Sequence, residues 1–171
     1  MLMAFWEVQR LTREIHHLEY QALTVRHKLA RYQKYAGMLG SSNYMTVANI
    51  SGLPSELRCR ATIFAQYANQ ASTMSAVQNL QMAKMYGMVP MTGNALTQYQ
   101  LEMSAFARFK QESMKALKEQ EVAVLNEMEA EIQSELNAIE TSLTIKRESL
   151  KSCKELLREE AQNAAPKFGL S

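Results

Sequence analysis

The three histidines of this 171-residue chain are the first residues to test for metal chemistry. Glu14 and His17 have the Glu-x-x-His spacing of di-iron helical bundles, but that site needs a second such motif and two further carboxylates. His27 follows Thr24 at the same spacing, so the second motif is missing. His16 and His17 are adjacent and point about 100° apart on a helix, so they cannot share a metal ion. We therefore expect no metal and no cofactor.

The nucleophiles and acids give no catalytic arrangement either. All 17 acidic residues are Glu, so the chain lacks the Asp of a Ser-His-Asp triad, a Walker B strand or an EF-hand loop. Cys59 and Cys153 match no metal or redox spacing, so we expect two free thiols. The 6 scattered Gly form no phosphate-binding loop. These residues predict a protein that is not an enzyme.

The composition predicts an all-α fold. The chain has 21 Ala, 13 Gln and 12 Met but only 6 Gly and 3 Pro, and the abundant types are strong helix formers. Apolar residues make up 47% of the chain, and 33 of them are Ala or Met. The expected core is therefore thin and adaptable.

The clearest helix is predicted over about residues 3–39. Its apolar residues recur in alternating steps of four and three over five heptads, which is typical of a coiled coil. This apolar seam consists of Ala4, Val8, Leu11, Ile15, Leu18, Ala22, Val25, Leu29, Tyr32, Ala36 and Leu39. Gly37 and Gly40 end the helix. The following loop, 40–53, is long for a connection, which favours a functional or partner-contacting role and makes Tyr44 a candidate contact.

Two further helices are predicted over about 54–86 and 94–164. The first begins at Pro54 and stops at Gly87, and Asn94 caps the second after a turn at 87–93. The seam of the helix over 54–86 is rich in small residues, which let another helix approach closely: Leu57, Ala61, Phe64, Ala68, Ala71, Ser75, Gln78, Met82 and Met85. The seam of the last helix is Met114, Leu117, Glu121, Val124, Met128, Ile132, Leu136, Ile139, Leu143, Lys146, Leu150, Cys153 and Leu157.

Helix lengths predict one elongated domain over 1–171, an antiparallel helical hairpin or coiled coil of three helices. In it, 54–126 forms a distal hairpin, and 3–39 pairs with about 126–162. The net charges of 1–40, 41–113 and 114–171 are +3, +2 and −3, which agrees with a basic first helix on an acidic last one. Lys146 would then lie near Glu19. The alternative is a compact three- or four-helix bundle.

Two helices cannot cover each other's apolar sides as a bundle does, so residues outside the seams need cover from neighbouring chains. These residues are Phe5, Trp6, Ile63, Tyr67, Met74, Val77, Phe106 and Phe109. Five methionines gather at the predicted hairpin tip, either as core filler or as a contact surface: Met74, Met82, Met85, Met88 and Met91.

A basic stripe follows the outer face of the first helix. It consists of Arg10, Arg13, His17, His27, Arg31 and Lys34. A solvated face is the plain interpretation, a partner's acidic helix the second, and nucleic acid or lipid phosphate the third. Nucleic acid is disfavoured because the whole chain is only +2 and carries no recognised binding motif.

Helical arms from both ends of a chain, paired below a distal tip, are similar in architecture to flagellin-like and type III secretion filament subunits, with which this chain shares no motif. We expect a non-enzymatic, self-assembling helical subunit of a filament, secretion apparatus or phage-like particle. The alternatives are an adaptor or chaperone-like module that clamps a helical partner, and a nucleic-acid binder. The sequence shows no membrane span and no cleavable signal peptide, which predicts a cytoplasmic protein or one exported without a signal.

Overall fold

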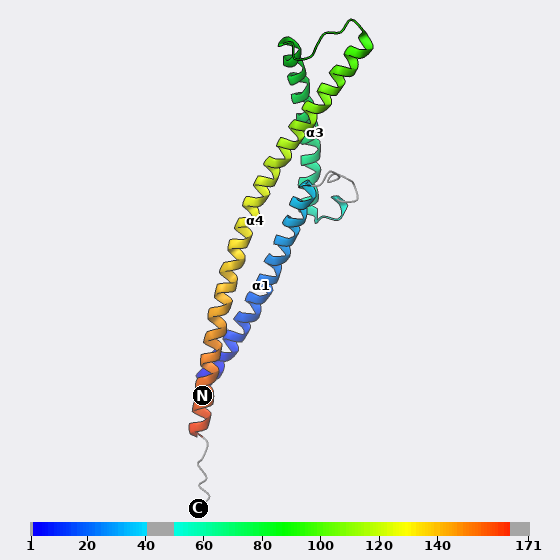
Figure 1. The fold of residues 1–171 in the computed structure, drawn as a ribbon. Helices are drawn as coiled ribbons and strands as arrows, with labels where there is room; N and C mark the ends of the chain where they lie inside the picture. The colour runs from blue at the N-terminus through cyan, green and yellow to red at the C-terminus, as the bar shows by residue number, and fades with distance from the viewer. Residues whose placement is uncertain (1, 41–49, 165–171) are drawn as a thin grey trace, which may run out of the picture. The chain divides into compact units, whose positions relative to one another are not determined.

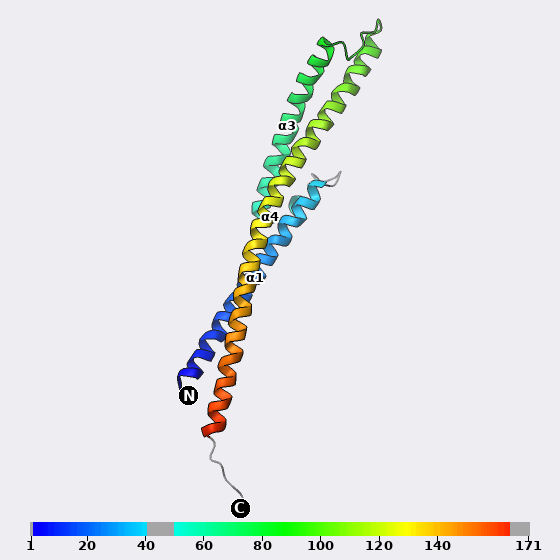
Figure 2. The same ribbon diagram turned by 60° about the vertical axis from the view of Figure 1, so that its left-hand side comes forward.

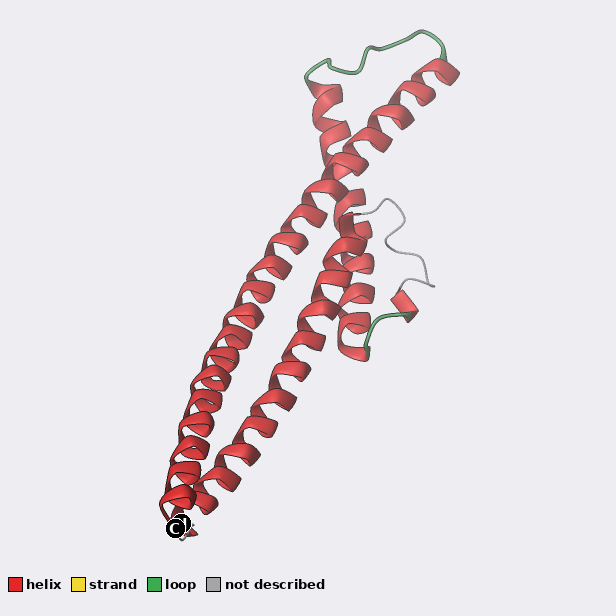
Figure 3. Ribbon diagram, turned by 60° about the horizontal axis from the view of Figure 1, so that its bottom comes forward, coloured by secondary structure: helices red, strands yellow, loops and turns green. Residues whose placement is uncertain are grey.

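The computed structural model describes residues 2–40 and 50–164, and no strand occurs among them (Figure 3). Three long helices account for nearly all of these residues: α1 (Leu2–Gly40), α3 (Ser55–Met85) and α4 (Ala95–Ala164) (Figure 1). Every helix end lies within one residue of the position predicted from the sequence. The all-α fold is therefore confirmed. Most of the predicted loop, including Tyr44, lies outside the described residues.

The chain divides into two compact units, and α1 and α4 contribute to both. The first unit combines residues up to Ala30 with those from Ala130 onward, and the second comprises Arg31–Glu129. The single elongated domain expected over 1–171 stays a prediction, as does the choice between a hairpin and a bundle.

Side chains and a glycine fix the turn between α3 and α4. The Asn94 side-chain oxygen accepts a 3.0 Å hydrogen bond from the backbone N–H of Leu96, which confirms its capping role. At the end of α3, Gly87 has a φ of 68°, a left-handed conformation that favours glycine. The N–H groups of Gly87 and Met88 donate to the carbonyls of Lys84 and Ala83, which closes the last turn.

In the first unit, α1 and α4 pack side by side along the predicted seams (Figures 1 and 2). The buried residues are Leu11, Ile15, Ala22 and Val25 of α1 and Ile132, Leu136 and Leu143 of α4. All seven belong to those seams, so the buried face of each helix here follows its predicted seam. Large apolar side chains on the other faces remain exposed: Phe5, Trp6, Tyr20, Leu23, Ile145 and Leu156.

In the second unit, three helices meet around one core. Its buried residues are Tyr35, Leu39, Leu53, Leu57, Ala61, Phe64, Ala68 and Leu125. The end of α1 therefore packs beside the start of α3, whereas the sequence predicted that these helices lie end to end. The predicted seam residue Val124 of α4 is 42% exposed, and its neighbour Leu125 is fully buried. The buried face of α4 is therefore displaced by one residue from the predicted seam at this point.

The predicted seam of α3 is wrong beyond Ala68. Burial continues through Ser72, Ala76 and Ala83, while Met82 and Met85 are exposed. Ala61, Ser72 and Ala83 recur at intervals of 11 residues, a period that does not produce the left-handed supercoil of heptads. Small side chains on this inner face leave room for a close approach to α4, which lies alongside (Figure 2).

Replacing Leu125 with Ala should destabilise the second unit by about 2–5 kcal/mol, because the fully buried side chain leaves a cavity at the junction of three helices. Chemical denaturation followed by circular dichroism measures this free energy. The matched control is Val124→Ala, whose partly exposed side chain should cost far less. Equal losses in the two variants would contradict the assignment of Leu125 to the core.

Candidate interaction surface

The five candidate methionines of the hairpin tip are all exposed, so none of them fills the core. Their exposed fractions range from 48% at Met82 to 96% at Met91. Further large apolar side chains lie exposed on the same stretch of α3, the turn and α4: Tyr86, Leu96, Tyr99 and Met103. The second unit thus exposes a surface rich in large apolar side chains around this turn.

This surface carries almost no charge. Between Ala61 and Leu101 the only charged residue is Lys84, although charged residues make up 21% of the chain. Lys84 donates to Glu102 over 2.5 Å, so its charge has a partner within the unit. Depletion of charge together with exposed Met and Tyr is the composition of a protein–protein interface core. This depletion is present in the sequence alone, although it did not enter the predictions above.

The tip is held by its own contacts. Val89 is buried within the turn. The Thr92 N–H donates to the Gln98 side-chain oxygen over 2.9 Å, which ties the turn to the first turns of α4. This hydrogen bond and the buried Val89 hold the backbone of the turn in place. A partner would therefore meet a fixed backbone, and mainly the flexible methionine side chains would adapt to it.

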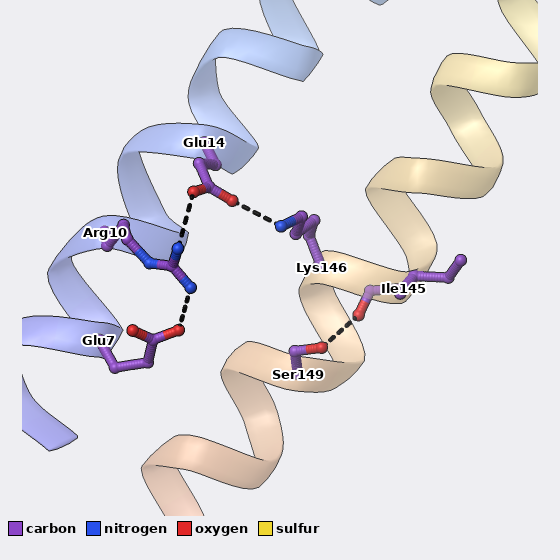
Figure 4. Close-up of polar contacts among 6 residues, drawn as sticks. All are labelled: Glu7, Arg10, Glu14, Ile145, Lys146 and Ser149. Carbon is purple, nitrogen blue, oxygen red and sulfur yellow. Dashed lines mark hydrogen bonds and ion pairs between the residues drawn. The ribbon is translucent and has the colours of Figure 1, made fainter.

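The basic stripe of α1 is partly neutralised. In the first unit, Arg10 bonds Glu7 and also pairs with Glu14, and both contacts raise its pKa (Figure 4). Arg13 is exposed and pairs with no other described residue. In the second unit, Arg31 and Lys34 are likewise exposed and pair with no described residue. The positive charge of Arg10 is therefore balanced within its own unit, whereas Arg13, Arg31 and Lys34 remain available to a partner's acidic side chains.

Ion pairs join the two helices of the first unit. Lys146 Nζ lies 2.7 Å from the Glu14 carboxylate (Figure 4), and Arg147 bonds Glu19 over 2.6 Å. The hydrogen bond from Lys146 lowers the pKa of Glu14, and the bond from Arg147 lowers that of Glu19. Lys146 was expected near Glu19; the structure places it on Glu14.

A cavity of about 530 Å³ lies in the second unit between the end of α1 and the middle of α4. Leu39, Met114 and Val122 supply its apolar wall, and Lys118 and Glu119 lie at the same site. Partial burial lowers the pKa of Lys118. The volume falls in the range of binding pockets, so this is a second place where a ligand or partner side chain could dock.

Within residues 2–40 and 50–164, no three His, Cys or Glu side chains gather to hold a metal ion. Cys59 and Cys153 are free thiols, as expected. No described helix has an apolar stretch long enough to cross a membrane. The chain matches no known family model, no curated protein and no solved structure.

The ion pairs of the first unit should make its stability against unfolding depend on pH. Because folding lowers the pKa values of Glu14 and Glu19, their contribution is complete above the unfolded value of about 4.3 and is lost as pH falls through the lowered values. The thermal midpoint of the helical signal should therefore fall between about pH 6 and pH 3, and less so in a Glu14→Gln, Glu19→Gln variant.

The control for this experiment removes two other carboxylates, Glu148→Gln and Glu159→Gln, which are exposed and pair with no described residue. This variant should keep the pH dependence of the unmodified chain. If both variants lost it equally, general charge rather than the two ion pairs would account for the effect.

Proposed function

We propose that this chain is a non-enzymatic structural protein that assembles with copies of itself. The observation that supports this most is the exposed, nearly uncharged surface of the second unit between Ala61 and Leu101. Monomeric proteins rarely expose a contiguous apolar patch larger than a few hundred Å², and larger patches mark interaction sites.

The free energies of side-chain burial and of association imply a contact that buries several large side chains. Full burial of one large apolar side chain contributes about 1.5–3 kcal/mol, whereas association costs about 4–15 kcal/mol in lost freedom of motion. Several anchors must therefore be buried together. The tip offers Met82, Met85, Tyr86, Met88 and Met91 within one short stretch of chain.

The first unit supports the same proposal independently. Its two helices leave Trp6 and Tyr20 about two-thirds exposed, together with Leu23 and Ile145. A subunit that contacts its neighbours through this unit would have these side chains covered in the assembly. A filament, a secretion apparatus or a phage-like particle is the kind of assembly that such a subunit would build.

A second candidate function is an adaptor that clamps a helical partner. The cavity lined by Leu39, Met114 and Val122 favours it, because an apolar side chain of a partner helix would fit a recess of this size. An adaptor of this kind would remain a monomer or dimer in the absence of its partner.

The size of the particles in solution tests self-assembly. Light scattering over a concentration series should show large oligomers, and replacing Met85, Met88 and Met91 with Gln should shift the population to small species, because the polar amides remove the apolar anchors. Circular dichroism checks that the helices persist.

The matched control neutralises three exposed cations, with Arg13, Arg31 and Lys34 replaced by Gln, and it should leave the oligomers intact. A loss of assembly only in this control would favour the acidic-helix contact of the basic stripe instead. A strict monomer at every concentration in the unmodified chain would overturn the proposal.

A further inference from the structure

The outer face of α3 carries a second regular pattern, separate from its buried face. Ile63, Tyr67, Gln70, Met74, Val77 and Gln81 follow one another in steps of four and three, and all six are exposed. We call them the outer stripe. Ile63, Tyr67 and Met74 are each about 60% exposed. The stripe lies opposite the small buried residues, such as Ala68 and Ser72, that face the rest of the unit.

The two faces of α3 differ in spacing. The buried face has alternating four and three steps only from Leu57 to Ala68 and then continues at Ser72, Ala76 and Ala83, whereas the outer stripe keeps the alternating four and three steps of a heptad seam throughout. A heptad seam on an exposed face is the pattern that a second helix packs against in a left-handed coiled coil. No described segment of the chain covers the stripe, because all six residues remain exposed.

We propose that α3 of a second copy of the chain covers the outer stripe, in antiparallel orientation and with the two-fold axis near Gln70. This contact rests on the proposed self-assembly and identifies one of its interfaces. Most closed homo-oligomers contain such a two-fold interface, in which the same surface serves both subunits.

The charges at the ends of α3 support the antiparallel orientation. Glu56 lies in its first turn and Lys84 in its last, and no charged residue occurs between Arg60 and Lys84. Gln70 is midway between Glu56 and Lys84 in sequence. Antiparallel pairing therefore brings Glu56 of one copy near Lys84 of the other. Parallel pairing would place Glu56 beside Glu56, and like charges in such positions repel.

The stripe is also symmetric about its centre. Ile63 and Val77 lie seven residues on either side of Gln70, so the axis brings each apolar residue near an apolar residue of the other copy. Tyr67 lies three residues before Gln70 and Met74 four residues after it, so these two side chains also come near each other across the axis. Near the axis, two Gln70 side chains approach each other. An amide carries both donors and an acceptor, so the pair can hydrogen-bond, and a polar residue within an apolar seam fixes register.

Cysteine cross-linking in the full-length chain tests this contact. Cys59 and Cys153 are first replaced by Ser, and the particle size of that background is checked by light scattering. A Gln70→Cys variant should then form a disulfide-linked dimer on mild oxidation. A mixture of Ile63→Cys and Val77→Cys chains should cross-link, whereas neither variant alone should, because antiparallel packing keeps identical positions apart.

A charge at the axis provides the second measurement. Gln70→Glu places two like charges opposite each other and should weaken the α3 contact at least about tenfold, measured as a shift of the concentration at which oligomers form. The matched control is Asn69→Glu, an exposed position one residue away and outside the stripe, which should change this concentration little.

The outcomes separate this contact from self-assembly in general. Cross-linking of Ile63→Cys with itself would overturn the antiparallel orientation. Large particles with no cross-link at position 70 and no effect of Gln70→Glu would overturn the α3 contact and leave self-assembly standing. A monomeric unmodified chain would overturn both, and capture of a different protein on the stripe would replace the second copy as occupant.

Discussion

One helix can cover only part of the surface of another, and the rest of this structure depends on this constraint. A helix has side chains on all sides, and a single neighbour buries only one stripe of them. In the first unit, α1 and α4 bury their shared seam and leave Trp6 and Ile145 in solvent. In the second unit, a third helix closes the core around Leu125. Where only α3 and α4 continue toward the tip, apolar side chains are exposed again.

This constraint explains which parts of the fold could be predicted. The helix ends follow from local signals such as the cap at Asn94 and the left-handed Gly87, which need no knowledge of distant contacts. The seam of the first unit was predictable because one partner helix requires one heptad stripe. The prediction failed at Val124, where α4 packs in the core of three helices and buries the next residue, Leu125, instead. The spacing of apolar residues along one helix does not contain the position of a third helix.

Only part of the candidate surface could be predicted from the sequence. Residue type pointed to the methionines near Met85, but the predicted seam placed Met85 in an interface, and only the structure shows that it is exposed. Net charge was a poor guide to local pairs. The first helix is basic overall, yet two of its pairs with α4 use carboxylates of the first helix, Glu14 and Glu19. Ion pairing depends on which charged side chains lie opposite each other. The net charge of a whole segment does not contain this information.

The small inner face of α3 has a consequence for how the sequence can vary over time. Ala68, Ser72 and Ala76 are completely buried, and nearly every substitution at such a position enlarges the side chain. Overpacking typically costs about 1–3 kcal/mol, so drift toward larger residues is opposed along this whole face. A leucine core can exchange one large residue for another of similar volume, whereas this face has only glycine, alanine and serine available to it. This face should therefore change slowly.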